Sequence, residues 1–450
     1  MLQDSDAKTV AIETLGCKVN RYESAFLEEM FLQSGYQIVP FTEWANIYLV
    51  NTCTVTHKVD YQCRQLIRRA HQKNPSALIV VTGCYAQSSP EVIANLPGVK
   101  LIVGNPEKVD LLRFLNEGVT DSPRTFLSPV NGEQKFGDPA LTIFRHRTRA
   151  FLKIQDGCNS SCTYCIVPKV RGRNRSLPLD EVVQRLEILV NSGHKEIVLT
   201  GIHLGTYGLD LCPSSNLLAL LRSIEEKTHV KRLRLSSIEP LEISLKLIQF
   251  ISSSNVVCPH LHIPLQSGDD EILKRMNRPY RRQYFQQLIA DLASNIRSVC
   301  IGVDVIVGFP GEDEEKFENT LNFLESLPLA YLHVFPFSRR KGTEAAAFPD
   351  QVDQKIIKRR AENLRQLSIR KRGEYYRGFI GKNVSLLIEG RRDPSGHYVE
   401  GLSSHYIPVF VESTEHLLVA NEEVEARVIK VEGEKVYGRL ISLAKADDLC

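Results

Sequence analysis

Short apolar runs alternate with longer stretches of helical spacing over the first third of the chain. The helical stretches include Arg21 to Ser34 and Lys58 to Gln72. The apolar runs have the length of β-strands. They are Thr9 to Thr14, Ile47 to Asn51, Ala77 to Thr82 and Val99 to Val103. This alternation predicts an open parallel sheet in an N-terminal α/β domain, which we place at residues 7–120.

The middle of the chain repeats a strand-and-helix unit after a linker. Residues Asp121 to Pro139 are rich in proline and glycine, which predicts the linker. The expected strands are Phe151 to Gln155, Glu196 to Thr200, Arg232 to Ser236, Leu261 to Pro264, Gly302 to Val307 and Tyr331 to Phe335. Six such units predict an open or partial (β/α)6 barrel at residues 140–372, with its chemistry on the loops that follow the strands.

From Gly373 the pattern changes to short alternating strands separated by glycine and polar turns. The expected strands are Val384 to Glu389, Tyr398 to Glu400, Val409 to Glu412, Val424 to Val431 and Lys435 to Leu440. The last two are joined by Glu432-Gly433-Glu434, a three-residue hairpin loop. We expect a small antiparallel β-barrel at residues 373–443.

Composition narrows the class of protein. The chain has 450 residues, 43% hydrophobic and 24% charged, which suits a globular protein of two to four domains. It has no apolar run of about 18 residues, and its first residues are acidic, so we expect no membrane segment and a cytoplasmic location. The net charge is only +3, so a nucleic-acid site must be a local patch.

Cys158, Cys162 and Cys165 form a C-x3-C-x2-C pattern after a predicted strand. A 4Fe-4S cluster normally takes four cysteine thiolates, so three thiols leave one iron open for substrate chemistry. The same spacing also fits one face of a helix, but the intervening glycine, asparagine and serines favour a turn. Structural zinc needs a fourth ligand nearby, and the next cysteine is Cys212.

Three more cysteines follow predicted strands of the N-terminal domain. Cys17, Cys53 and Cys84 each lie just past a strand's C-terminal end, the edge at which open α/β sheets bind ligands. The three thiols therefore converge if the sheet is parallel. Isolated buried cysteines are also common, and the residues alone leave a second metal site and buried thiols both open.

Basic residues gather at two places. One group flanks the 158–165 loop, so that a polyanion can lie across it; it consists of Arg145, His146, Arg147, Arg149, Lys169, Arg171, Arg173 and Arg175. The other is the helical stretch Lys355 to Arg372, whose charges have nearly all one sign beside an apolar stripe at Ile357, Ala361, Leu364 and Leu367. This one-signed face leaves phosphate contact and an ordinary solvated surface both open.

The 158–165 loop resembles the signature of the radical S-adenosylmethionine (SAM) enzymes. In that superfamily the open iron binds SAM, and the aromatic residue between the last two cysteines, here Tyr164, lies beside the adenine. The segments around Cys17, Cys53 and Cys84, namely Thr14 to Asn20, Asn51 to Thr56 and Val81 to Gln87, look like the motifs that hold a second 4Fe-4S cluster in methylthiotransferases. The resemblance thus implies two 4Fe-4S clusters and SAM.

Further strand ends match methylthiotransferase motifs. They are Glu196 to Gly201, Leu235 to Pro240, His262 to Gly268 and Gly302 to Glu312. Polar groups on them make Gln266, Glu239 and Asp304 candidates for holding SAM. His203, in Gly201 to Gly205, either helps to select substrate or is a packed structural residue. The C-terminal barrel resembles the RNA-binding TRAM domain of the family, although a purely structural barrel stays open.

The resemblance is strongest to the branch that acts on threonylcarbamoyladenosine next to the tRNA anticodon. It implies methylthio transfer to carbon 2 of that adenine, with a tRNA anticodon stem-loop, a flavodoxin or ferredoxin reductant and a sulfur donor as partners. An aromatic C–H bond resists acid-base chemistry, so we expect no side chain to be a conventional general base. Alternatives are isopentenyladenosine or a ribosomal-protein aspartate as substrate, a single-cluster radical SAM RNA methylase, and a noncatalytic RNA-binding protein with structural metal.

Overall fold

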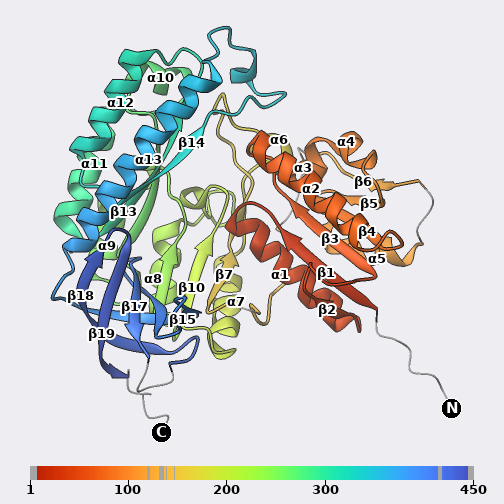
Figure 1. Ribbon diagram of the computed structural model, residues 1–450, viewed down its shortest axis with the longest axis horizontal. Coiled ribbons are helices and arrows are strands. Elements are labelled where there is room, and N and C mark those ends of the chain that lie inside the picture. The colour runs from red at the N-terminus through yellow and green to blue at the C-terminus, as the bar shows by residue number, and fades with distance from the viewer. Residues whose placement is uncertain are drawn as a thin grey trace.

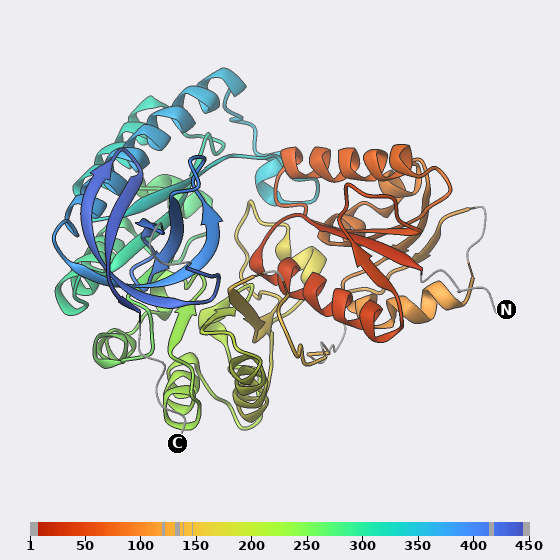
Figure 2. The same ribbon diagram turned by 60° about the horizontal axis from the view of Figure 1, so that its bottom comes forward.

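The computed structural model describes residues 8–118, 122–130, 136–137, 139–145, 147–413 and 418–443. Within these ranges the chain forms an N-terminal sheet domain, a central half-open barrel and a small C-terminal barrel (Figure 1). The small C-terminal barrel and the N-terminal domain lie on different sides of the central barrel (Figure 2). No described helix is long and apolar enough to cross a membrane.

The N-terminal domain is a parallel sheet, as predicted. In the described residues its strand order is β2-β1-β3-β4-β5-β6. The strands are β1 (Thr9–Thr14), β2 (Gln37–Val39), β3 (Ile47–Thr52), β4 (Leu78–Gly83), β5 (Val99–Val103) and β6 (Arg124–Phe126). The helices are α1 (Lys18–Gln33), α2 (His57–Lys73), α3 (Cys84–Ser88), α4 (Pro90–Ala94) and α5 (Leu111–Asn116).

One part of the predicted linker is wrong. Residues Arg124–Phe126 form strand β6, which pairs in parallel with β5 and extends the N-terminal sheet beyond residue 120. The Phe126 ring stacks on Phe114 of α5, with ring centroids 3.9 Å apart, and this contact fixes the short strand. A strand of three residues beside a proline gives too short an apolar pattern to be recognised in sequence.

The central domain is the expected partial barrel of parallel strands. Its hydrogen-bonded groups among the described strands are β11-β10-β7 and β12-β13-β14. An isolated parallel bridge between Leu233 and Val257 lies where the two groups meet. The strands are β7 (Arg149–Lys153), β10 (Glu196–Thr200), β11 (Arg232–Leu235), β12 (His260–Gln266), β13 (Cys300–Val307) and β14 (Tyr331–Pro336).

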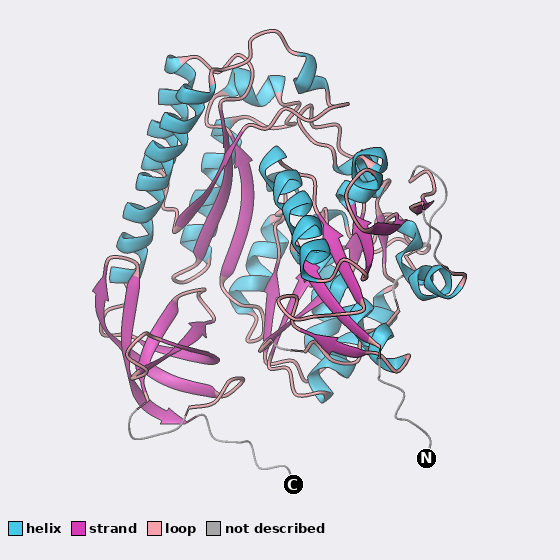
Figure 3. Cartoon of the chain, turned by 45° about the vertical axis from the view of Figure 1, so that its right-hand side comes forward, coloured by secondary structure: helices cyan, strands magenta, loops and turns pink. Residues whose placement is uncertain are grey.

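Helices cover the outside of these strands (Figure 3). They include α7 (Leu179–Asn191), α8 (Leu217–Lys227), α9 (Leu245–Ser253), α10 (Asp270–Arg275), α11 (Arg282–Asn295), α12 (Glu314–Ser326) and α13 (Gln354–Arg377). The shorter α6 (Val167–Arg171) and the strand pair β8 (Gln155–Asp156) and β9 (Arg175–Ser176) enclose the 158–165 loop. One continuous hydrophobic cluster joins barrel strands, helices and α1, so the N-terminal domain packs directly on the barrel.

The C-terminal domain is a closed barrel with the strand order β15-β16-β17-β19-β18 in the described residues. Its strands are β15 (Asn383–Arg392), β16 (Tyr398–Ser403), β17 (Pro408–Glu412), β18 (Glu423–Glu432) and β19 (Lys435–Leu443). The pairings are antiparallel as predicted, except that β17 and β19 run parallel. Its Ser403 and Ser404 carbonyls accept hydrogen bonds from Arg234 of β11.

The apolar stripe of the predicted basic helix is confirmed, because Ile357, Ala361, Leu364 and Leu367 are buried on α13. The one-signed charged face is not. Arg359 contacts Glu314, Arg370 contacts Glu325 and Arg372 contacts Glu434, while Lys371 donates to backbone carbonyls. Acidic groups from other elements thus offset part of the helix charge, and phosphate contact there stays a prediction.

Candidate two-cluster site

The three barrel cysteines lie on a loop, as predicted, and not on a helix face. Residues 157–166 contain no helix or strand, and α6 begins only at Val167. The loop starts at Gly157, whose φ of +72° and closeness to Arg173 exclude any side chain: a Cβ there would lie 1.9 Å from the Arg173 carbonyl oxygen. The backbone of Cys158 donates a hydrogen bond to the Gly172 carbonyl at 3.0 Å.

Polar groups from the barrel surround these thiols. Cys158 Sγ lies 3.3 Å from His203 Nδ1, and His203 Nε2 lies 2.6 Å from Glu242. Burial alone would raise the pKa of the Cys158 thiol, but the hydrogen bond and charge of His203 and the hydrogen bonds with Ser160 together lower it. Arg278 donates to Cys162 Sγ at 3.4 Å. Donors aimed at sulfur suit thiolates that hold a cluster.

The N-terminal cysteines converge at one edge of the sheet. Cys17 precedes α1, Cys53 follows β3 and Cys84 begins α3. A Cβ on Gly16, the neighbour of Cys17, would lie 2.8 Å from Cys53 Sγ. Burial raises the pKa of the Cys53 thiol, and the nearby Cys84 and Cys17 thiols raise it further. The spatial convergence expected from strand ends is therefore present.

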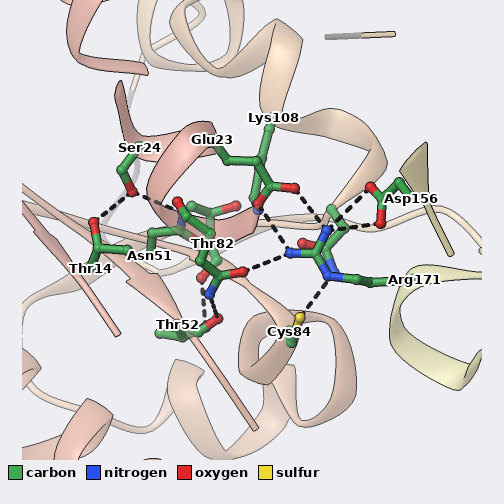
Figure 4. A network of polar contacts seen from close by, with 12 residues as sticks. Thr14, Glu23, Ser24, Asn51, Thr52, Thr82, Cys84, Lys108, Asp156 and Arg171 are labelled. Carbon is green, nitrogen blue, oxygen red and sulfur yellow. Dashed lines mark hydrogen bonds and ion pairs between the residues drawn. The ribbon is translucent and has the colours of Figure 1, made fainter. Parts of the chain in front are cut away.

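A buried network of charges links α1, which follows Cys17, with β8, which precedes the barrel cysteine loop (Figure 4). Arg171 of α6 contacts Glu23 of α1 at 2.8 Å and Asp156 of β8 at 3.1 Å. Lys153 of β7 contacts the same two carboxylates at 3.1 Å each, and Lys108 also contacts Glu23. Burial would raise the pKa of the Glu23 carboxyl, but Arg171, Lys108 and Lys153 hold it well below its ordinary value.

Arg171 also organises the N-terminal loop. Its guanidinium donates to Asn20 Oδ1 at 2.6 Å, and Asn20 donates to the carbonyls of Leu15 and Thr52, which lie just before Cys17 and Cys53. Burial would lower the pKa of the Arg171 guanidinium, but the carboxylates of Glu23 and Asp156 help to hold it well above its ordinary value. One side chain from the segment after the barrel loop thus reaches into the N-terminal cysteine set.

The four residues expected to contact SAM have different surroundings. Tyr164 packs edge-on against Phe309, with centroids 6.5 Å apart, and Glu239 pairs with Arg278 beside Cys162. Gln266 ends β12 with a φ of +71°, an uncommon conformation for a residue with a side chain. Asp304 instead contacts His262 and His333. Contact of these four with SAM stays a prediction.

Several residues of the site were not found by sequence reasoning. Arg278, Glu242 and Lys153 carried no motif signal, and His333 was included only in a predicted strand. Of the expected basic flank, Arg171 and Arg175 point into the protein and contact Asp156, whereas Arg173 is exposed. Arg145, Arg147 and Arg149 line a cavity of about 650 Å³ shared with the C-terminal barrel. His146 lies outside the described residues.

Comparison with known proteins decides the family. Residues 9–104 match Uncharacterized protein family UPF0004, and residues 152–324 match the radical SAM superfamily. The chain is 39% identical over 431 residues to the "Threonylcarbamoyladenosine tRNA methylthiotransferase MtaB" of Bacillus subtilis (strain 168), covering 94% of each chain. The chain belongs to the radical SAM methylthiotransferase family.

Other methylthiotransferases are similar over nearly as much of the chain. The identically named protein of Aquifex aeolicus (strain VF5) is 38% identical, with coverage of 87% of this chain and 95% of the relative. The "tRNA-2-methylthio-N(6)-dimethylallyladenosine synthase" of Acetivibrio thermocellus (strain ATCC 27405) is 32% identical, with coverage of 85% of this chain and 81% of the relative. Membership makes this chain a radical SAM enzyme that uses SAM and two 4Fe-4S clusters.

The fold has a similar solved structure outside the methylthiotransferases. The radical SAM methyltransferase TsrM of Kitasatospora setae superposes with a TM-score of 0.53 at 13% identity, covering 75% of this chain and 77% of that one. At this identity the likeness concerns the fold alone. The two thiol sets of this methylthiotransferase fit its clusters, because each offers three free thiols at one place and none of the six is in a disulfide.

Proposed function

We propose that this methylthiotransferase adds a methylthio group to carbon 2 of N6-threonylcarbamoyladenosine beside the anticodon of tRNA. The proposal rests on relatives named for that substrate, to which most of the chain is similar at 33–39% identity. The two convergent cysteine sets support it, because a methylthiotransferase needs both. When bound, the clusters and SAM supply the electron, the radical and the methyl group that an unactivated aromatic C–H bond requires.

The chain's own residues then have separate tasks in this proposal. Cys158, Cys162 and Cys165 hold one cluster, and Cys17, Cys53 and Cys84 hold the other. Tyr164, Gln266 and Glu239 position SAM beside the first cluster, where Arg278 keeps the Glu239 carboxylate oriented. The buried ion pairs of Arg171 keep the two cysteine sets in register. No side chain acts as a conventional general base.

We assign tRNA contact to the cavity of about 650 Å³ between residues 143–149 and the C-terminal barrel. Arg147 and Arg391 both line it, and Arg145 is exposed at its wall. Arginines from two domains around one hollow suit phosphate groups of a folded RNA. A tRNA substrate also implies a cytoplasmic location, and the chemistry implies a one-electron reductant, such as flavodoxin or ferredoxin, and a sulfur donor.

The test is a substrate comparison with the reconstituted enzyme under anaerobic conditions. Transfer RNAs carrying either threonylcarbamoyladenosine or isopentenyladenosine are incubated with SAM, dithionite and sulfide, then digested to nucleosides for mass spectrometry. We expect the methylthio product from the threonylcarbamoyl substrate alone. A methylthio product from the isopentenyl substrate alone would contradict the proposal and identify isopentenyladenosine in tRNA as the substrate. Cleavage of SAM without either thiolated nucleoside would contradict tRNA methylthiolation.

A further inference from the structure

Three potential metal ligands meet on adjacent strands of the central barrel, outside both cysteine sets. They are His262 of β12, Asp304 of β13 and His333 of β14. Asp304 is paired with His333 in the strand register. His262 Nε2 lies 3.1 Å from Asp304 Oδ1 and 3.1 Å from His333 Nδ1, and the last two atoms are 3.3 Å apart.

The triangle has the dimensions of a metal site. The point equidistant from its three corners lies about 1.8 Å from each, so a cation at the usual distance of about 2.0–2.1 Å sits just outside the plane. A ring nitrogen has a single in-plane direction for a hydrogen or a lone pair, so the imidazoles cannot each point at two partners. One central cation satisfies all three atoms at once.

The surroundings fix the ligands in place. Ser237 Oγ lies 2.7 Å from His262 Nδ1, which sets the ring so that Nε2 faces the triangle. Such a hydrogen bond to the far nitrogen is the usual support of a metal-bound histidine. Asp304 Oδ1 is buried, and its contacts with the two imidazole nitrogens, at 3.1 and 3.3 Å, do not have the geometry of hydrogen bonds. It is the kind of unsatisfied acceptor that a bound cation explains.

The barrel strands leave room for this arrangement. Gly302, the strand neighbour of Tyr331, lets the tyrosine ring lie across β13, since a Cβ there would lie 2.1 Å from Tyr331 Cζ. The Tyr331 hydroxyl lies 2.8 Å from His260 Nε2, and its ring is next to those of His262 and His333. A tyrosine and a third histidine thus pack beside the triangle without entering it.

The charges nearby permit a cation, and a hollow gives access to it. Arg234 contacts Glu196 at 2.7 Å, and Arg149 contacts Glu389 at 2.8 Å. A carboxylate therefore balances the positive charge of each guanidinium. His333 is exposed and lines a cavity of about 320 Å³ between the two barrels.

We propose that His262, Asp304 and His333 bind one divalent transition-metal cation, separate from both iron-sulfur clusters. Two imidazoles and one carboxylate suit Zn²⁺ or Fe²⁺, and three protein ligands leave open positions for water or an oxygen donor of a bound molecule. Asp304 is a metal ligand in this arrangement and not a SAM contact. The proposal does not depend on the identity of the tRNA substrate.

The test uses zinc as the probe, because iron is already present in the clusters. The fully reconstituted holoenzyme is incubated with a small excess of ZnCl2, passed through a desalting column, and analysed for zinc and iron by mass spectrometry. Wild type is compared with His333→Gln and Asp304→Asn. The control is His229→Gln, which removes a histidine that contacts Glu187 at 2.8 Å on the protein surface.

We expect about one zinc per chain in the wild type and the control, and binding at least about tenfold weaker in both triangle variants. Iron of about eight per chain in every protein shows that the clusters, and hence the fold, are intact. Equal zinc in the wild type and the two variants would place the metal elsewhere, for example on another cysteine, and overturn the proposal. Absence of retained zinc from the wild type would overturn it as well.

Discussion

The barrel cysteines share one loop between β8 and α6, whereas the N-terminal cysteines come from three separate strand ends. The first set is positioned by local geometry, above all by Gly157, which no other residue can replace without displacing Arg173. The second exists only after a parallel sheet has brought its strand ends together. The two sets therefore depend on different kinds of structure, although each presents three thiols to a cluster.

Removing each set in turn should give the largest and most distinct effects. Replacing Cys158, Cys162 and Cys165 by alanine should lower iron from about eight to about four per chain and abolish SAM cleavage. Replacing Cys17, Cys53 and Cys84 should lower iron equally but preserve SAM cleavage, because the barrel cluster stays. Iron analysis and a SAM-cleavage assay check both. Iron of about four in the unaltered holoenzyme would refute two clusters.

The contact between the two sets can be broken at Arg171. An Arg171→Met variant leaves Glu23 and Asp156 buried with fewer counter-charges, so we expect a loss of about 3–5 kcal/mol in unfolding free energy. Urea unfolding of the holoenzyme measures it. Arg173→Met is the matched control, since Arg173 is exposed two positions further on. Equal stability of the two variants would show that the network does not hold the domains together.

Substitution of Arg278 should affect only the site around the barrel cysteines. Arg278 contacts Cys162 and Glu239, so Arg278→Gln should weaken SAM binding about tenfold by removing a charge-assisted hydrogen bond. Iron content should stay at about eight per chain. Equilibrium dialysis with labelled SAM checks the affinity, and Arg281→Gln, at an exposed position, serves as the control. Unchanged affinity in Arg278→Gln would remove Glu239 and Arg278 from the proposed SAM site.

The smallest effect should lie outside both sets. Arg147→Ala with Arg391→Ala should raise the KM for tRNA and reduce the salt dependence of binding by about one to two counter-ions, with SAM cleavage unchanged. Titration of labelled tRNA at several salt concentrations measures this slope. A slope equal to that of the wild type would place the tRNA on another surface.

Sequence alone predicted the features that depend on local pattern or on strand ends. The loop position of Cys158 and the convergence of Cys17 with Cys84 follow from turn residues and parallel strands. Features made by distant partners were missed. The charges of α13 looked uncompensated because Glu314, Glu325 and Glu434 lie on other elements, and Glu242 and Arg278 reach the barrel cysteines only through the fold. Strand β6 was too short to leave a pattern.

The position of Arg171 has a consequence for how the protein is made. Glu23 and Asn20 leave the ribosome long before Lys153 and Arg171, the barrel cations that contact them. A nascent N-terminal domain therefore has Lys108 as the partner of Glu23 but lacks the side chain that organises its cysteine loop. The contacts of Arg171 with Asn20 and Glu23 can accordingly form only after the segment that follows the second cysteine set has been synthesised.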